Sequence, residues 1–178
     1  MLPHVLPLSF HDMSPETQKA YESEYALRGP VTNMKRTLLH SLTAYRVYMG
    51  FYDLAQKVSD TIGRTGQWLF CHSIAVGNQC AVCSTYFGYL LKQNGINPSE
   101  YKPSDTEALL MELGRQLSRD NETARVTSDV WQKLKKNYSD EQIVDLIALG
   151  SQMVAANQFN DVLEVDVANN IHEEAIAR

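Results

Sequence analysis

The segment 66–95 constrains the fold most, because it predicts two apolar helices separated by a short break. A glycine followed by Asn78 marks the break, and Gly95 ends the second helix. A Cys-x-x-Cys pair, Cys80 and Cys83, follows the break directly, so the pair lies in or beside the first turn of the second helix. We expect Asn78 to be the N-cap residue of that helix.

This position suits the two thiols to redox chemistry. A helix N-terminus carries partial positive charge and free N–H groups, which favour a thiolate over a thiol. Two thiols three residues apart on one turn can also close a disulfide after a modest adjustment. The alternative is a pair of buried structural thiols. The third cysteine, Cys71, lies in an apolar helical run and is typical of a small core residue.

Helix start and stop signals continue along the rest of the chain, whereas no segment shows the alternation of a strand. Ser14 before a proline, Ser104, and Ser139 at the start of a capping box are clear cap residues. Expected helices cover residues 15–27, 33–42, 43–58, 65–76, 79–94, 104–117, 128–137, 139–160 and 161–175. We predict an all-α fold of about seven to nine helices in one domain, 1–178, with an extended arm over residues 1–13.

Composition narrows the class of function. Apolar residues make up 44% and charged residues 21% of the chain, as in soluble globular proteins. The net charge of −5, with scattered basic residues, argues against a nucleic-acid partner. No stretch is long and apolar enough for a membrane span, and the first ten residues lack the features of an export signal. We expect a reducing, cytoplasmic location, where a Cys-x-x-Cys pair is more often catalytic or metal-binding than structural.

A metal site is the other use of such a pair. The side chains near the break with zinc-ligand chemistry are Cys71, His72, Cys80 and Cys83. Adjacent helical residues point about 100° apart, so Cys71 and His72 cannot easily face one metal ion. We therefore expect neither a metal nor a cofactor.

The surroundings of the cysteines resemble the carboxymuconolactone decarboxylase superfamily, and within it the alkylhydroperoxidase D-like (AhpD-like) branch. The motifs that carry the resemblance are Cys-Ala-Val-Cys at 80–83 and the Asn-Gly-Ile helix stop at 94–96. Weaker matches are segment 34–50 and segment 139–160, the latter with an Asn-x-x-Asn-type ending at Asn157 and Asn160. The resemblance spans roughly 29–165 and implies an AhpD-like helical bundle.

The resemblance also implies a function. Members of this branch use the cysteine pair as a redox centre, so we expect a thiol–disulfide oxidoreductase that reduces disulfides or, weakly, alkyl and hydrogen peroxides. An external dithiol or a peroxiredoxin would be the redox partner, and the family assembles as homotrimers or hexamers. The second cysteine is usually the more exposed in the family, so Cys83 is expected to attack and Cys80 to resolve.

One part of the family motif is missing. Relatives have a Glu twelve residues before the first cysteine and a His four residues after the second, which act as a proton relay. Trp68 and Phe87 occupy these positions here, and neither side chain can transfer a proton. His72 lies one helical turn after Trp68, and we hypothesise that it replaces the relay, although a core or interface histidine fits the same pattern. Tyr86, one turn past Cys83, is a weaker candidate as a hydrogen-bond donor.

Two other functions remain open. One is a carboxymuconolactone decarboxylase-like lyase, although that branch of the superfamily lacks the cysteine pair. The other is a non-catalytic oligomeric interaction protein whose cysteines are remnants. Reversible oxidation of Cys80 and Cys83 would favour the oxidoreductase over both.

Overall fold

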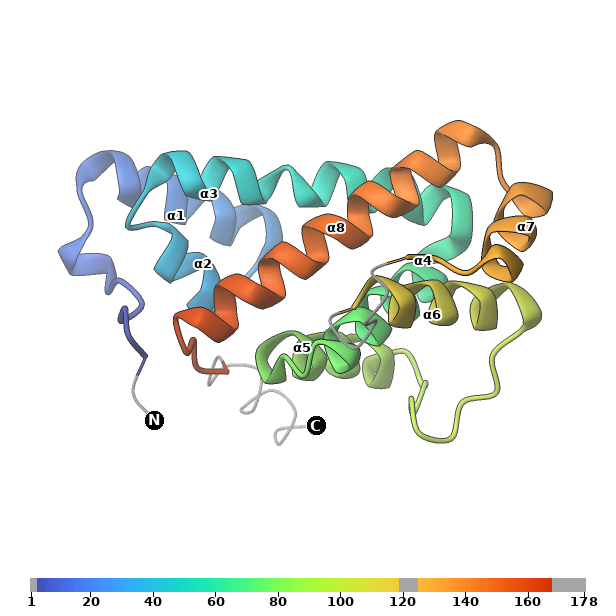
Figure 1. Ribbon diagram of the computed structural model, residues 1–178. Coiled ribbons are helices and arrows are strands. Elements are labelled where there is room, and N and C mark those ends of the chain that lie inside the picture. The colour runs from blue at the N-terminus through green and yellow to red at the C-terminus, as the bar shows by residue number, and fades with distance from the viewer. Residues whose placement is uncertain (1–2, 119–124, 168–178) are drawn as a thin grey trace. The chain divides into compact units, whose positions relative to one another are not determined.

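The computed structural model describes residues 3–118 and 125–167, and all regular structure within these residues is helical (Figure 1). The helices, in chain order, are α1 (Pro15–Arg28), α2 (Asn33–Leu38), α3 (Leu42–Met49), α4 (Phe51–Gly77), α5 (Ala81–Gln93), α6 (Asp105–Leu117), α7 (Ser128–Asn137) and α8 (Asp140–Val162), preceded by a 3-10 turn η1 (Phe10–Asp12). This confirms the predicted all-α fold class.

The chain divides into two compact units. The first contains the residues up to Gly50 and those from Phe159 onward, and the second contains residues 51–158. The cysteine pair and its neighbouring helices belong to the second unit. A single domain over 1–178 and an N-terminal arm over 1–13 stay predictions.

Each helix of the first unit begins at a hydroxyl-bearing residue. The side chains of Ser14, Thr32 and Ser41 each accept a hydrogen bond from the backbone N–H three residues later. These bonds satisfy donors that a helix start otherwise leaves unpaired. The buried apolar cluster of this unit consists of Met13, Leu38, Leu39 and Tyr45.

A buried carboxylate ties three helices of the first unit together. Glu24 on α1 is 3% exposed, and its carboxylate pairs with Lys35 on α2, which is 7% exposed. The Tyr45 hydroxyl on α3 donates to the same carboxylate at 2.8 Å, and Arg28 pairs with it at 2.8 Å. A buried charge is tolerated only when paired and hydrogen-bonded, so this cluster fixes how the three helices pack.

The helix expected over 43–58 is wrong as a single element. α3 ends before Gly50 and α4 begins directly after it. Ser41, not Thr43, is the cap of α3. The boundary falls at a residue of low helix propensity, and Gly50 itself keeps a right-handed helical backbone with φ of −58° and ψ of −18°.

In the second unit, α4 lies against both α5 and α6 (Figure 1). α4 bends at Gly63, whose φ of 77° and ψ of 155° are not helical, so the two helices expected on either side are distinct there. The α6 backbone approaches α4 closely: a Cβ added at Gly114 would lie 2.8 Å from the Phe70 carbonyl oxygen. The largest fully buried side chains of this unit are Phe70, Leu69, Ile74, Leu91, Leu110, Leu113, Leu134, Leu146, Leu149 and Val58.

α8 confirms one expectation and corrects another. Its capping box is present, because the Ser139 N–H donates to the Gln142 side chain and the Gln142 N–H donates to the Ser139 hydroxyl. The separate last helix expected over 161–175 is wrong where it can be compared, because Asp161 lies inside α8 and residues 163–167 are not helical. Residues 168–175 of that expectation lie outside the described residues.

None of the described helices combines the length and the apolar character that crossing a membrane requires.

Candidate active site

A tight turn between α4 and α5 positions the cysteine pair. Gln79 adopts a positive φ of 58°, its N–H donates to the Val76 carbonyl at 2.9 Å, and the Cys80 N–H donates to the Ala75 carbonyl at 3.0 Å. This pattern is a Schellman ending for α4. α5 then starts at once, with Cys80 as its N-cap residue. The expected N-cap, Asn78, is instead buried in the turn, because the residue in the left-handed conformation must come between the two helices.

The two cysteines therefore stand as N-cap and third residue of α5. Both residues thus belong to the first turn of α5, whose N-terminus carries partial positive charge, and the Cys80 side chain makes no capping hydrogen bond there. Cys83 also begins a buried stripe that continues at Phe87 and Leu91, at intervals of four residues. Cys80 and Cys83 are both members of the buried hydrophobic core of the second unit.

Exposure distinguishes the two thiols. Cys80 is 0% exposed, whereas Cys83 is 7% exposed. The larger exposed fraction of Cys83 agrees with the expectation that its thiol attacks the substrate. Both residues are nevertheless buried, so a substrate could reach the Cys83 sulfur only if the side chains around it move.

Aromatic side chains fill the two positions where the family has its relay. Trp68 packs against the hydrophobic core, and Phe87 is buried within it. The ring of Tyr86 meets that of Phe87 edge to face, with 5.2 Å between centroids. Cys80 and Cys83 therefore belong to a core cluster that also contains Phe87 and is packed by Trp68 and Tyr86.

His72 faces a different part of α5 from Cys83. A Cβ added at Gly88 would lie 3.6 Å from the His72 Nε2. Gly88 is five residues past Cys83, which on an α-helix is about 7.5 Å along the axis and about 140° around it. Burial lowers the pKa of His72, so its imidazole is neutral near pH 7. The relay role of His72 stays a prediction, and this placement does not favour direct contact with Cys83.

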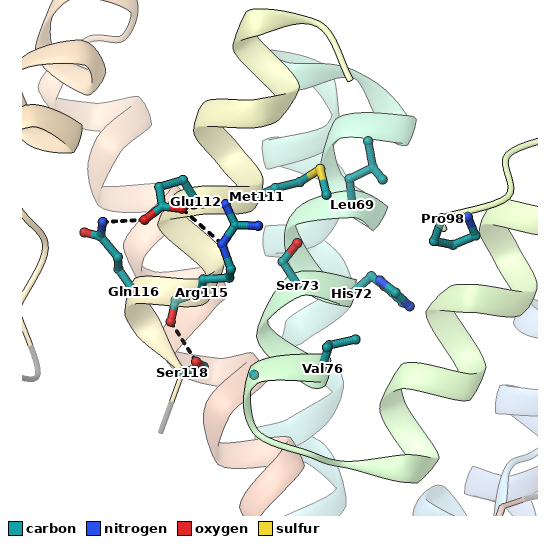
Figure 2. Close-up of a pocket in the computed structure, with 11 residues that line it drawn as sticks. Leu69, His72, Ser73, Val76, Pro98, Met111, Glu112, Arg115, Gln116 and Ser118 are labelled. Atoms are coloured by element: carbon teal, nitrogen blue, oxygen red, sulfur yellow. Dashed lines mark hydrogen bonds and ion pairs between the residues drawn. The ribbon is translucent and has the colours of Figure 1, made fainter. Parts of the chain in front are cut away.

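His72 instead lines a pocket of about 590 Å³ between α4, α6 and the segment that joins α5 to α6 (Figure 2). The pocket residues are Leu69, His72, Ser73, Val76, Gly77, Pro98, Met111, Glu112, Arg115, Gln116 and Ser118. Sequence analysis did not single out Glu112 and Arg115, because opposite charges three residues apart on an amphipathic helix are also typical of a solvated face.

Cys71 is a core residue, as predicted. It is 0% exposed, and burial raises the pKa of its thiol to about 12 despite a hydrogen bond of 3.3 Å from the Gln67 amide. Such a thiol stays protonated and unreactive at neutral pH. Among the described residues, no three or more His, Cys, Asp and Glu side chains gather as a metal site.

Solved structures with this arrangement of helices are known. A peroxidase-related protein from Silicibacter sp. TM1040 has a TM-score of 0.75 and 14% identity, covering 97% of this chain and 95% of its own. The AhpD core of a peroxidase-related protein from Ralstonia eutropha JMP134 has a TM-score of 0.70 and 13% identity, covering 96% and 95%. The debrominase Bmp8, as a cysteine-to-alanine variant in complex with 2,3,4-tribromopyrrole, has a TM-score of 0.76 and 16% identity, covering 98% of both chains.

These likenesses establish the fold, which is that of the AhpD-like peroxidase-related proteins. No protein-family model and no curated protein sequence matches the chain.

Proposed function

We propose that the chain is an AhpD-like thiol–disulfide oxidoreductase that reduces a substrate with the Cys80–Cys83 pair. The observation that carries the proposal is the position of the two cysteines as N-cap and third residue of α5. There the helix dipole favours a thiolate, and the two sulfurs are near enough in sequence to bridge. The shared fold with peroxidase-related proteins supports the same reading.

The reaction has two steps in this proposal. The Cys83 thiolate attacks one sulfur of a substrate disulfide, forms a mixed disulfide and releases the other sulfur as a thiolate. The Cys80 thiol then attacks the Cys83 sulfur, loses its proton, and releases the second substrate sulfur. The substrate disulfide gains two electrons and two protons, one from Cys80 and one from solvent, to which Cys83 released its own proton on ionising, and the protein gains the Cys80–Cys83 disulfide. An external dithiol restores the pair by the reverse exchange.

The missing relay favours disulfides over peroxides as substrates. Attack on a peroxide expels an alkoxide or hydroxide, which needs a proton as it leaves, and a positioned acid normally supplies it. Trp68 and Phe87 hold no such proton. A thiolate leaving group needs no acid near neutral pH, so disulfide exchange loses less from these substitutions. We expect peroxide reduction by the pair to be slow and disulfide reduction to be the faster reaction.

Trapping experiments test the proposal. The reduced protein is mixed with a small aromatic disulfide or with cumene hydroperoxide, quenched with an alkylating agent and mapped by mass spectrometry. We expect a Cys80–Cys83 bridge that dithiothreitol reverses, and a stable mixed disulfide on Cys83 in Cys80→Ser. Cys71 is the internal control in the same spectrum, because its buried thiol should stay unmodified until the protein unfolds. Thiols at 80 and 83 that stay as inert as Cys71 would leave the lyase or the non-catalytic reading.

Reductive removal of halogen from an aromatic ring is a second candidate. The aromatic surfaces of Trp68 and Tyr86, which are only partly buried, can stack on a planar ring, and the fold is shared with the debrominase Bmp8. In the balanced reaction the two thiols lose two hydrogens and form the disulfide, the ring exchanges bromine for hydrogen, and hydrogen bromide leaves. Release of bromide from 2,3,4-tribromopyrrole in the presence of dithiothreitol, absent in Cys83→Ser, would select this reaction over disulfide exchange.

A peroxiredoxin or another dithiol protein as redox partner, assembly into trimers or hexamers, and a cytoplasmic location belong to the same proposal. Size-exclusion chromatography with light scattering measures the assembly directly.

A further inference from the structure

The pocket between α4 and α6 has the dimensions of a small-molecule site. Its volume of about 590 Å³ falls within the range of about 300–1,000 Å³ typical of ligand pockets. No cysteine is among the side chains that line it, so it is separate from the dithiol. All of its lining belongs to the second unit of the chain.

One side of the pocket is apolar. Leu69 and Val76 lie seven residues apart on the same face of α4, and Met111 of α6 lies opposite Leu69 (Figure 2). Val76 is 53% exposed and stands at the surface, whereas Leu69 is buried. The unbranched Met111 side chain can adapt its shape to a ligand.

The α6 wall of the pocket also offers a hydrogen-bond donor, Arg115, one helical turn after Met111. The Arg115 Nε and Nη2 both donate to the same oxygen of Glu112. Within residues 3–118 and 125–167, the Nη1 group of Arg115 donates to no acceptor. Its N–H groups are therefore available to an acceptor on a ligand.

The charges in the lining cancel. The Arg115 guanidinium and the Glu112 carboxylate form an ion pair, and His72 is neutral near pH 7 because burial lowers its pKa. A charged ligand would lose hydration on entry without a net opposite charge to compensate it. An uncharged ligand loses much less hydration free energy on entry. It can still pack against the apolar side chains and accept a hydrogen bond from Arg115.

We propose that this pocket binds a small uncharged molecule with an apolar body and a carbonyl-type acceptor. The body packs against Val76 and Met111, and the acceptor receives a hydrogen bond from the Arg115 Nη1 group. The proposed binding uses neither cysteine and goes beyond the proposed reaction.

Three naphthalene probes of the same shape test the proposal: 2-naphthamide, which is uncharged, 2-naphthoate, and 2-naphthylmethylammonium. Binding is followed by the ¹³C-methyl signal of Met111, assigned with Met111→Leu. We expect 2-naphthamide to shift this signal saturably and to bind more tightly than either charged probe. Arg115→Met should weaken 2-naphthamide about tenfold, the effect of one hydrogen bond to a charged group.

Control variants separate the pocket from other surfaces. Arg46→Met removes an exposed arginine of the first unit and should leave binding unchanged, whereas Val76→Trp fills the mouth of the pocket and should abolish it. Cys83→Ser should bind the probe as well as the parent chain does. A signal that does not saturate, a charged probe that binds as tightly as the amide, or equal effects of Arg115→Met and Arg46→Met would overturn the proposal.

Discussion

Replacing Glu24 by Gln should destabilise the first unit by several kcal/mol. The substitution keeps the size of the side chain but removes the charge that compensates Lys35, which is only 7% exposed. Breaking a buried ion pair by neutralising one partner costs about 3–5 kcal/mol, because the other charge remains buried without compensation. Arg28 adds little to this figure, since its side chain is 26% exposed and can turn toward solvent.

Two further variants resolve that loss into its parts. Tyr45→Phe removes one hydrogen bond to the carboxylate and should cost about 1.5–3 kcal/mol. Adding Lys35→Met to Glu24→Gln removes the buried ammonium group whose ion pair with Glu24 was lost, and should restore part of the stability. Urea unfolding followed by circular dichroism measures each free energy, and hydrogen exchange of the α1–α3 amides locates the loss in the first unit.

The acid dependence of stability gives an independent measurement. Burial would raise the pKa of Glu24, but the hydrogen bonds and charges of Lys35, Tyr45 and Arg28 outweigh it and lower the pKa below 4.5. The stabilisation by this carboxylate is therefore complete above the ordinary carboxyl pKa and is lost as the pH falls through the lowered one. Glu24→Gln should lack this component of acid unfolding. A Glu24→Gln protein within about 0.5 kcal/mol of the parent at neutral pH would refute the reasoning.

Three further predictions concern the second unit. Gln79→Gly should stabilise the protein by about 1 kcal/mol in urea unfolding, because glycine adopts the positive φ of this turn without strain, and an unchanged or lower midpoint would contradict that. Gly114→Ala should cost about 1–3 kcal/mol in the same assay, since the new Cβ would lie 2.8 Å from the Phe70 carbonyl, and a neutral result would show that α6 can move away. His72→Ala should leave the rate of Cys83 alkylation unchanged across neutral pH, whereas a slower rate would support the relay hypothesis.

Much of the fold could be predicted from local signals. Ser14, Ser104 and Ser139 each carry their own capping chemistry, and the structure shows helices starting directly after all three. The predicted helix boundaries were wrong where the boundary depends on more than the adjacent residues. Asn78 looks like an N-cap in isolation, but Gln79 takes the left-handed conformation, so the N-cap of α5 is Cys80 and the helix starts at Ala81. Likewise, nothing in the sequence around Asp161 indicates that α8 continues through it.

The candidate site could also be predicted only in part from the sequence. The spacing of Cys80 and Cys83 and the nearby glycine predict a dithiol beside a helix start, because these features act over a few residues. The direction of His72 could not be predicted, since it depends on the space that Gly88 leaves on a neighbouring helix. The ion pair of Glu112 and Arg115 becomes part of a pocket only through the packing of α6 on α4.

The backbone of Cys80 belongs to two helices at once. Its N–H closes the end of α4 on the Ala75 carbonyl, and its own carbonyl accepts the first helical bond of α5, from the Ser84 N–H at 2.9 Å. The main chain at residue 80 is thus held in place by one hydrogen bond to each helix. If the two sulfurs move together to form a disulfide, Cys83 and the first turn of α5 must therefore move more than Cys80 does. The flexibility that a redox cycle requires would lie in that single turn.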